Sequence, residues 1–509
     1  MTDTLHIIWF KRDLRHVDHE PLYEAVRTAI ESGDKILPLY ILEPELWQQP
    51  DMSHRHYAFL CECLLSLKQD LNGRLIVRVG EAVSVLEALH QEYKHIQLWS
   101  HQESWNGWTY KRDIAVGKWA KDHNMTWHEY SNFGVVRRLK SRDDWADAWH
   151  KIMLRPIIAE PPEFHMIDIV SDALPASHKL GLTDDGCIWR QKGGRKEGLQ
   201  MLDSFLNLRG EHYTKDMSSP VTAFEACSRI SPYLSFGCVS MREVFQIASQ
   251  READIKNMPY QMRGKWGSAL RSFLGRLRWH CHFIQKLEDA PQIEFQNMHP
   301  LYDGLRENDF NIEFFEAWKS GKTGYPMIDS AMRALIQTGW INFRMRAMLM
   351  SFASYHLWLH WRQTSLYLAR LFVDYEPGIH YSQAQMQSGT TGINAIRIYN
   401  PIKQGIDQDP EGIFIRKWLP ELKDMPQDAL HAPWKHHSLM GEYPMPIINE
   451  KTARKMAADK IYSLRKQEGH RDGAKKVYEK HGSRKKATQK KRAKKSEEKP
   501  SPKQGELPF

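Results

Sequence analysis

The first 130 residues alternate short apolar runs with amphipathic stretches. The apolar runs are LHIIWF, ILPLYIL, RLIVRVG and HIQLWS, and each has the length of a buried parallel strand. The stretches between them show helical spacing over Glu20–Ser32, His56–Leu71 and Ala82–Tyr93. Strand and helix in repeated order predict a doubly wound α/β domain with a parallel sheet, which we assign to residues 1–131.

This pattern changes at three further points along the chain. Residues 132–195 are rich in turn formers and lack sustained periodicity, which indicates a long interdomain connection lying over the surface. Residues 196–482 show helical spacing without strand alternation, as in Met241–Ile255 and Met345–Tyr375, and predict an all-α domain with its own core. Residues 483–509 are basic and of low complexity, so we expect a disordered tail.

The net charge of +9 is concentrated at the C-terminus. Ten Lys and Arg and three Glu lie within 484–509, which gives +7 there and leaves about +2 for the rest of the chain. The total charge therefore says little about a binding face on the folded body. For the tail itself, a solvating extension and an arm that attracts nucleic acid both remain open.

The cysteines and the hydropathy indicate where the protein resides. None of the six cysteines forms a CxxC pair, so we expect reduced thiols in a cytosolic protein. The N-terminal segment MTDTLHIIWFKRDLR has no apolar signal-peptide core, and no apolar run approaches the roughly 20 residues of a membrane span. The expectation is a cytoplasmic protein, monomeric and without membrane contact.

Five ordered blocks carry a resemblance to a known family. They are IWFKRDL at Ile8–Leu14, SRISPYLSFG at Ser228–Gly237, GKTGYPMIDSAMRALIQTGW at Gly321–Trp340, IRIYNPIKQG at Ile396–Gly405 and IRKWLPEL at Ile415–Leu422. In this order they resemble the photolyase/cryptochrome family of flavoproteins. The resemblance implies that the helical domain binds FAD and that the protein uses blue or near-ultraviolet light.

Two groups of residues in these blocks are candidates for holding FAD. Ser231 followed by Pro232 predicts a capped helix start, which is either an ordinary cap or an anion site; the resemblance makes it the cradle of the FAD pyrophosphate. Arg346 and Asp374 lie in apolar helices and should be paired, because an isolated buried charge is costly. The resemblance places this pair beside the isoalloxazine ring. The full set assigned to the cofactor is Tyr213, Cys227, Ser228, Arg229, Ile230, Ser231, Phe273, His280, Phe343, Arg346, Asp374, Glu376 and His380.

The electron relay of the family is altered in this chain. Well-studied photolyases pass electrons to the flavin through three tryptophans, and the middle one matches Trp361. The inner position falls among 381–384, where no tryptophan occurs, and the outer one falls near Asn308. Tyr381 and Trp340 are candidate substitutes. His380 is nearest in register to the asparagine that many relatives hold near flavin N5.

The residues that would face DNA are also partly changed. Trp279 matches a tryptophan that stacks on a flipped lesion, whereas Arg276 replaces a typical glutamate and His280 a typical arginine. Phe343 and Ala347 stand where relatives specific for (6-4) photoproducts carry paired histidines. Candidate phosphate contacts are Arg397, Lys403 and Arg416, for which solvated surface positions are the alternative.

No metal site is expected. Neighbouring residues of the His280–His282 segment point about 100° apart on a helix, so they do not converge on one ion. No cysteine follows Cys281, which excludes the iron–sulfur cluster that some bacterial relatives hold through four thiolates.

The resemblance implies a deoxyribodipyrimidine photolyase that acts on UV-damaged DNA, with cyclobutane dimers as the favoured lesion. The implied reaction is transfer of one electron from FADH⁻ to a flipped-out dimer, ring splitting and return of the electron. A cryptochrome that signals without repairing DNA is the alternative. A second, antenna chromophore of folate, deazaflavin or flavin type is possible, and Ser100–Tyr110 is a candidate lining for it.

Overall fold

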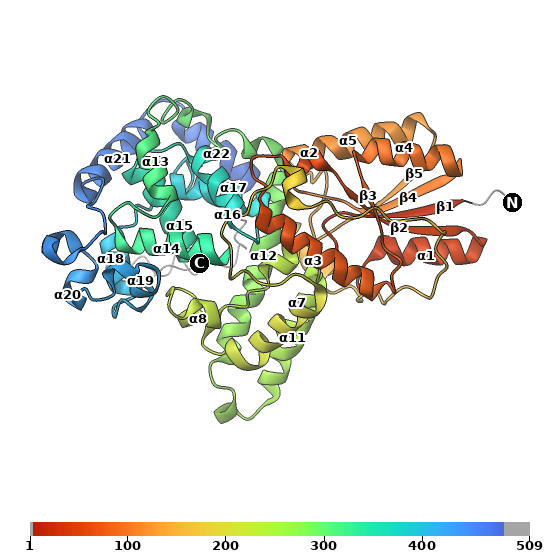
Figure 1. Ribbon diagram of the computed structural model, residues 1–509, viewed down its shortest axis with the longest axis horizontal. Coiled ribbons are helices and arrows are strands. Elements are labelled where there is room, and N and C mark those ends of the chain that lie inside the picture. Colours follow the sequence, from red (N-terminus) through yellow and green to blue (C-terminus); the bar gives the residue numbers. More distant parts are fainter. Residues whose placement is uncertain (1–3, 483–509) are drawn as a thin grey trace.

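The computed structural model describes residues 4–482. It consists of an α/β part and a larger helical part, with α7, α8 and α11 forming a projection between them (Figure 1). The tail expected at 483–509 lies outside the described residues. Within residues 4–482, no helix is both long enough and apolar enough to cross a lipid bilayer.

The α/β part holds a five-stranded sheet in the order β3-β2-β1-β4-β5. All four strand pairs are parallel. The strands are β1 (Leu5–Phe10), β2 (Lys35–Leu42), β3 (Ile76–Val79), β4 (Ile96–His101) and β5 (Thr126–Tyr130). The predicted doubly wound sheet is confirmed, and its order reverses between β1 and β4, where ligands bind in such folds.

Alternate residues of the strands enter two different cores. Ile7 and Trp9 of β1 pack in the cluster that includes Leu86 of α4, whereas Ile8 and Phe10 face the cluster that includes Leu22 of α1. Burial on both faces explains why these strands appear as continuous apolar runs. The covering helices are α1 (Glu20–Ser32), α2 (Pro44–Trp47), α3 (His54–Asp70), α4 (Ala82–Tyr93) and α5 (Gly107–Asp122).

The connecting segment is more structured than its composition suggested. It contains the helix α6 (Trp145–Met153) and a 3₁₀ turn at Ser177–Leu180. Trp145, Trp149 and Met153 are buried and recur every four residues, so they share one face of α6. The Trp149 ring lies edge-on to Phe245, with 5.4 Å between centroids. The segment therefore does not merely lie over the surface but contributes to the core.

The remainder of the described chain is helical, as predicted. Its helices are α7 (Arg195–Ser204), α8 (Tyr213–Asp216), α9 (Ala223–Ala226), α10 (Ser231–Ser235), α11 (Met241–Asn257), α12 (Trp266–Asp289), α13 (Ile312–Lys319), α14 (Pro326–Thr338), α15 (Phe343–Ser351), α16 (Trp361–Leu371), α17 (Pro377–Ser388), α18 (Pro401–Gln408), α19 (Ile413–Trp418), α20 (Gln427–Leu430), α21 (Glu450–Arg465) and α22 (His470–His481).

The run expected to be helical over Met345–Tyr375 is interrupted. After α15, a π-helical turn at Phe352–His356 leads into an irregular stretch in which Trp358 has a positive φ of 55°. The chain resumes a helix at Trp361, where the His360 side chain accepts a hydrogen bond from the Arg362 backbone N–H. The break sets α15 and α16 at different positions around the same core.

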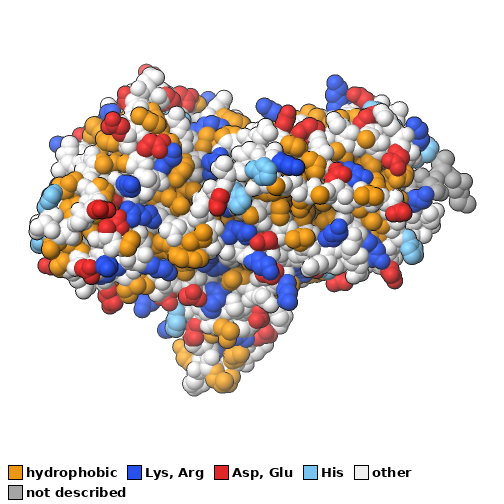
Figure 2. All heavy atoms as spheres, viewed as in Figure 1, with side chains coloured by type: hydrophobic (Ala, Val, Ile, Leu, Met, Phe, Trp, Pro, Cys, Tyr) orange, Lys and Arg blue, Asp and Glu red, His pale blue; other side chains and the backbone are white. Residues whose placement is uncertain are grey.

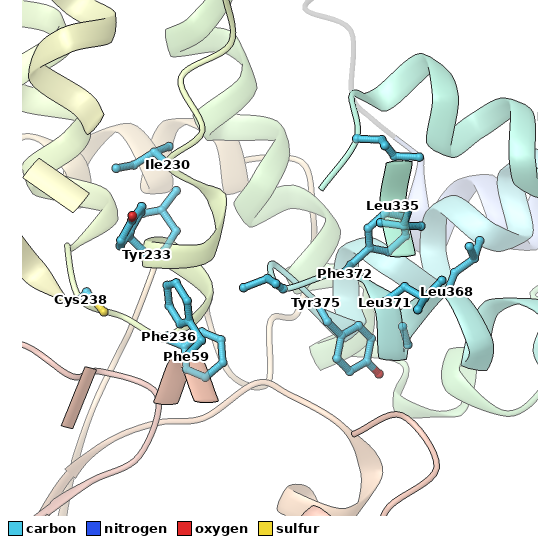
Figure 3. Packing of buried hydrophobic residues seen from close by; sticks show 14 of the residues in the cluster. Phe59, Ile230, Tyr233, Phe236, Cys238, Leu335, Leu368, Leu371, Phe372 and Tyr375 are labelled. Atoms are coloured by element: carbon cyan, nitrogen blue, oxygen red, sulfur yellow. The ribbon is translucent and has the colours of Figure 1, made fainter. Parts of the chain in front are cut away.

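The two parts meet along α3 and α10 (Figure 3). The Phe59 ring of α3 lies 4.9 Å from that of Phe236 and 5.7 Å from that of Tyr233. Gly237 has a φ of 68°, and a Cβ at this position would lie 2.2 Å from the Arg12 carbonyl oxygen. The glycine of the SFG sequence is therefore required by the close approach of the β1–α1 loop.

Candidate functional site

Arg346, Asp374 and Ser231 form one hydrogen-bonded cluster. The Arg346 guanidinium, on α15, donates to both Asp374 carboxylate oxygens, at 3.0 and 2.9 Å. The Ser231 hydroxyl of α10 donates to Asp374 Oδ2 at 2.6 Å. The sequence predicted the Arg–Asp pair. Together with the Ser231 bond, its bidentate geometry holds α10, α15 and the segment after Leu371 in one arrangement.

The expected N-cap at Ser231 is wrong. The α10 helix begins at Ser231, Ile230 takes the cap position, and no side chain caps the helix. Ser231 is the first residue inside the helix, and its hydroxyl is directed at the Asp374 carboxylate, to which it donates its proton. Ser231 therefore joins α10 to the Arg346–Asp374 pair rather than closing its own helix.

Two neutral histidines lie close to this cluster. Burial lowers the pKa of His280 and of His380 to about 4, against a weak opposing influence of Asp374 on each. The His380 Nε2–H donates to the Ser365 carbonyl at 2.8 Å, which leaves His380 Nδ1 as an acceptor. His280 Nδ1 is buried and has no hydrogen-bond partner among the described residues.

Glu376 is a buried carboxyl at the start of α17. Burial raises its pKa to about 8, although the Arg12 charge from the β1–α1 loop acts to lower it. At neutral pH this side chain is therefore mainly a carboxylic acid that can donate a hydrogen bond. Its Oε1 atom has no hydrogen-bond partner within residues 4–482.

One face of α12 carries the predicted cofactor and lesion residues together. Phe273 is buried against Phe205, with 4.9 Å between ring centroids, and Phe205 in turn lies 5.4 Å from Tyr213. One turn further, Arg276 interacts with the Tyr213 hydroxyl, whose pKa burial raises to about 12. Trp279 follows, half-buried. The spacing of three residues places these side chains along one stripe.

The stretch before α10 is held by arginines. The carbonyls of Cys227 and Ser228 accept hydrogen bonds from Arg209 at 2.8 and 3.5 Å. Arg229 has a positive φ of 56° and stacks over the Trp340 ring at 4.2 Å, while burial lowers the pKa of Arg229 to about 10. Trp340 thus lies beneath a cation.

The candidate relay residues fall into two separate groups. Trp361 and Tyr381 are both fully buried, and their ring centroids lie 6.4 Å apart. Trp340 instead packs edge-on to Phe224 at 5.1 Å. The structure thus brings Trp361 and Tyr381 together, and Trp340 belongs to a different aromatic group.

The predicted phosphate contacts are in different environments. Lys403 is exposed and pairs with Asp407 at 3.4 Å. Arg397 is half-buried. The Arg416 guanidinium donates to three backbone carbonyls, those of Glu411, Lys423 and Met425. Arg416 therefore holds a turn together. Its role toward DNA stays a prediction, as do the roles of Lys403 and Arg397.

Phe343, which the resemblance assigns to the cofactor, lies at the start of α15 and is 40% exposed.

A cavity lies at the carboxyl ends of β1, β2 and β4. Its walls include Glu103 and Trp105, which fall in the stretch Ser100–Tyr110 expected to hold an antenna chromophore. Charged groups meet here, since Arg112 donates to Glu43 at 3.0 Å. The other lining residues are Trp9, Phe10, Lys11, Arg12, Tyr40, Ile41, Leu46, Trp47, Met52, Leu60 and Phe236. Parallel α/β sheets bind ligands at this edge.

Comparison with known proteins defines the class. Residues 6–137 match the model of the DNA photolyase domain, and residues 273–463 match the FAD binding domain of DNA photolyase. The chain is 28% identical to deoxyribodipyrimidine photo-lyase of Streptomyces griseus over 88% of its own length and 97% of that protein. It is therefore a flavoprotein that binds FAD through its helical part. The chain belongs to the photolyase/cryptochrome family.

Two solved structures show the same fold. An archaeal photolyase from Sulfolobus tokodaii, described with two FAD molecules, is 26% identical with a TM-score of 0.74, and the match covers 90% of this chain and all of that one. A cryptochrome from Synechocystis sp. PCC6803 has a TM-score of 0.77 at 22% identity, over 90% of this chain and 99% of that chain. The resemblance identified from the five sequence blocks is confirmed, and so is FAD.

The side chains of the cluster fit this cofactor. FAD carries ring nitrogens and carbonyls that need both donors and acceptors, and His280 Nδ1 and Glu376 Oε1 are buried polar atoms without a partner in the part of the chain that the structure describes. Arg346 and Asp374 would orient the ring system from one side, and His380 offers its Nδ1 acceptor. Sequence reasoning missed Arg12, whose charge acts to lower the pKa of Glu376 although Arg12 lies 364 positions earlier in the chain.

Proposed function

We propose that the protein is a light-driven DNA photolyase that splits UV-induced pyrimidine dimers, with the cyclobutane type favoured. The observation that carries this proposal is the stripe of α12 on which the half-buried Trp279 follows Phe273 and Arg276, the residues that lie against Phe205 and Tyr213. Reduced FAD, when bound, supplies one electron to the dimer and recovers it after the ring has opened. The relatives named photo-lyase along nearly the whole chain support this assignment.

The chain's own residues would prepare both reactants. Arg346 and Asp374 would hold the flavin in a fixed orientation. The neutral Glu376 and the neutral His380 would provide hydrogen bonds without adding charge to a buried site. Trp279 would stack on the extruded dimer, whose weakened pairing reduces the cost of flipping. Figure 2 shows Lys and Arg side chains gathered near the middle of one face, where the helical part, the α/β part and the projection meet.

The test is repair of a defined lesion. Purified protein with reduced FAD is incubated with an oligonucleotide that contains one cyclobutane dimer, in blue light and in darkness. We expect dimer loss in the light only. Bound, reducible FAD without light-dependent dimer loss would overturn the proposal and favour a cryptochrome-type photoreceptor. A matched oligonucleotide with a (6-4) photoproduct decides the lesion type.

Trp279 gives a sharper prediction for DNA binding. Trp279→Ala removes the stacking surface, and one base stacked on an aromatic ring contributes about 1–3 kcal/mol, so affinity for dimer-containing DNA should fall roughly 5- to 150-fold. FAD absorbance should be unchanged. Tyr260→Ala, at an aromatic side chain that is 80% exposed, is the control and should bind as the parent does. Equal affinities of both variants would remove Trp279 from the lesion site.

We also propose the cavity at the sheet edge as the site of a second chromophore. The aromatic rings of Trp9 and Trp105 would suit a planar molecule, while the cations Lys11 and Arg112 are already paired with Asp113 and Glu43. The presence of two FAD molecules in the Sulfolobus tokodaii photolyase supports a flavin as one candidate. The absorption spectrum of protein isolated from its native host identifies the occupant.

A further inference from the structure

A row of buried aromatic rings runs from the helical part into the α/β part. Trp361 lies 6.4 Å from Tyr381, Tyr381 lies 6.3 Å from Tyr375, and Tyr375 lies 5.8 Å from Trp105, all measured between ring centroids. Each of the four is less than 10% exposed. Rings this close together can pass an electron from one to the next. The row can therefore conduct electrons, provided that one of its members can release one.

The row is connected to the cofactor cluster at Tyr381. This residue follows His380 in α17, and the two rings lie 5.4 Å apart. The His380 ring also lies 5.3 Å from that of Tyr375. Figure 3 shows Tyr375 beside Phe372 and Leu371, with its hydroxyl pointing away from Phe372. Both tyrosines therefore border the wall that carries Asp374 and His380.

The Tyr375 hydroxyl is hydrogen-bonded to a carboxylate. It has two acceptors within reach, Asp51 Oδ2 at 2.8 Å and the Tyr381 oxygen at 3.1 Å. Because a phenol has one proton and a carboxylate is the stronger acceptor, Tyr375 gives its proton to Asp51. Asn106 Nδ2 fixes the same Asp51 oxygen from a distance of 3.2 Å. Asp51 is only 3% exposed.

The groups next to each ring decide which ring stays oxidised after an electron has left the row. Trp361 donates its indole N–H to the Asn297 amide oxygen at 2.7 Å, and an amide is too weak a base to take that proton. The Arg12 guanidinium lies 4.1 Å from the centre of the Trp105 ring and disfavours positive charge there. Among the described residues, Tyr375 is the one ring of the four that donates its acidic proton to a carboxylate.

We propose that Tyr375 and Asp51 form a proton-coupled electron donor for the light-driven reduction of FAD. Tyr375 loses one electron to the light-excited oxidised flavin. At the same time its O–H bond breaks, and the proton passes along the existing hydrogen bond to Asp51 Oδ2. The products are a neutral Tyr375 radical and a protonated Asp51, so charge and protons balance. No positive charge remains on a buried ring.

The other ionisable groups around the pair do not take over this task. His56 stacks on Tyr375 at 6.0 Å, but it donates its Nε2 proton to the Phe372 carbonyl, and burial lowers the pKa of His56 to about 4. Burial raises the pKa of Glu294 to about 7, although Arg362 and Lys111 act to lower it, and its Oε2 atom accepts a hydrogen bond from the Gly107 backbone N–H. Within residues 4–482, Asp51 is the carboxylate bonded directly to a hydroxyl of this tyrosine pair.

Flash photolysis of the full chain with bound, oxidised FAD tests the proposal. A blue pulse without added reductant should produce the absorption and the electron paramagnetic resonance line of a neutral tyrosyl radical, and its formation should be slower in D₂O than in H₂O. A tryptophan radical alone, or a rate without solvent isotope effect, would overturn it. The assay needs FAD but no DNA, so failure of dimer repair would leave the outcome unaffected.

Variants separate this role from simple hydrogen bonding. Asp51→Asn keeps an acceptor oxygen but cannot accept the proton, and it should shorten the lifetime of the separated charges by about tenfold or more, equal to about 1.4 kcal/mol of barrier. Tyr375→Phe should abolish the tyrosyl signal. Tyr367→Phe is the control, because it also removes a tyrosine hydroxyl, one that donates to the Lys319 carbonyl at 3.0 Å, but lies outside the row. Parent-like lifetime and isotope effect in Asp51→Asn would refute the assignment of Asp51.

Discussion

Glu376 shows how one buried side chain couples the site to pH. Its pKa is about 8 in the folded protein because burial disfavours the charged form, compared with about 4.3 for an ordinary glutamate. Between these values the folded state keeps a proton that the unfolded state releases. The stabilisation from this group is therefore complete below pH 4 and is lost as the pH rises through about 8.

Glu376→Gln should flatten this dependence. Glutamine keeps the shape and the neutral state, so the free energy of unfolding should no longer fall with pH between 5 and 8, whereas in the parent this residue contributes a decrease of up to about 1.4 kcal/mol per pH unit. Urea unfolding at several pH values measures the free energy of unfolding of the parent and of the variant. Glu252→Gln, on α11, is the control. Identical slopes in parent and Glu376→Gln would show that the carboxyl is already ionised in the folded state.

At the scale of elements, the site depends on how closely α17 packs against α12. Gly378, in the first turn of α17, is the contact point, because a Cβ there would lie 2.6 Å from the Ile284 Cα of α12. Gly378→Ala should push the helices apart, lower stability by about 1–3 kcal/mol and weaken FAD retention. Gly267→Ala in α12 is the control, since its Cβ meets only the end of the Arg271 side chain at 3.7 Å. Thermal unfolding and the FAD-to-protein absorbance ratio report both effects, and a Gly378→Ala protein as stable as the control would contradict the close packing.

Elements with a local signal were predictable from the sequence, and contacts between distant segments were not. The parallel strands and α1 and α4 follow from periodicity, and the Arg346–Asp374 pair follows from the cost of an isolated buried charge. The Ser231 cap failed because its hydroxyl has a partner 143 residues away. Tyr375 and Asp51 are 324 residues apart, and no pattern in either segment indicates that they meet.

At the scale of the whole molecule, Asp18 joins three segments. It lies in the β1–α1 loop with a positive φ of 53°. Its Oδ2 accepts hydrogen bonds from Ser240 Oγ at 2.5 Å and from Arg242 Nε at 3.0 Å, and its Oδ1 accepts one from the Ile158 backbone N–H at 3.1 Å. Burial acts to raise the pKa of Asp18, but the bonds from Arg242 and Ser240 lower it overall. Its stabilisation is therefore present above an ordinary aspartate pKa and is lost as the pH falls through the lowered value.

Removing this charge should separate the unfolding of the two parts. Asp18→Asn tolerates the positive φ but leaves the nearly buried Arg242 guanidinium without its carboxylate, a loss of about 3–5 kcal/mol at the contact between the sheet and α11. Calorimetry should then resolve two transitions where the parent shows one, and limited proteolysis should cut within residues 132–195 first. Asp254→Asn removes an exposed charge from the same helix and should leave the single transition in place. A single transition in Asp18→Asn would mean that the apolar contacts of α3 with α10 alone make the two parts unfold as one.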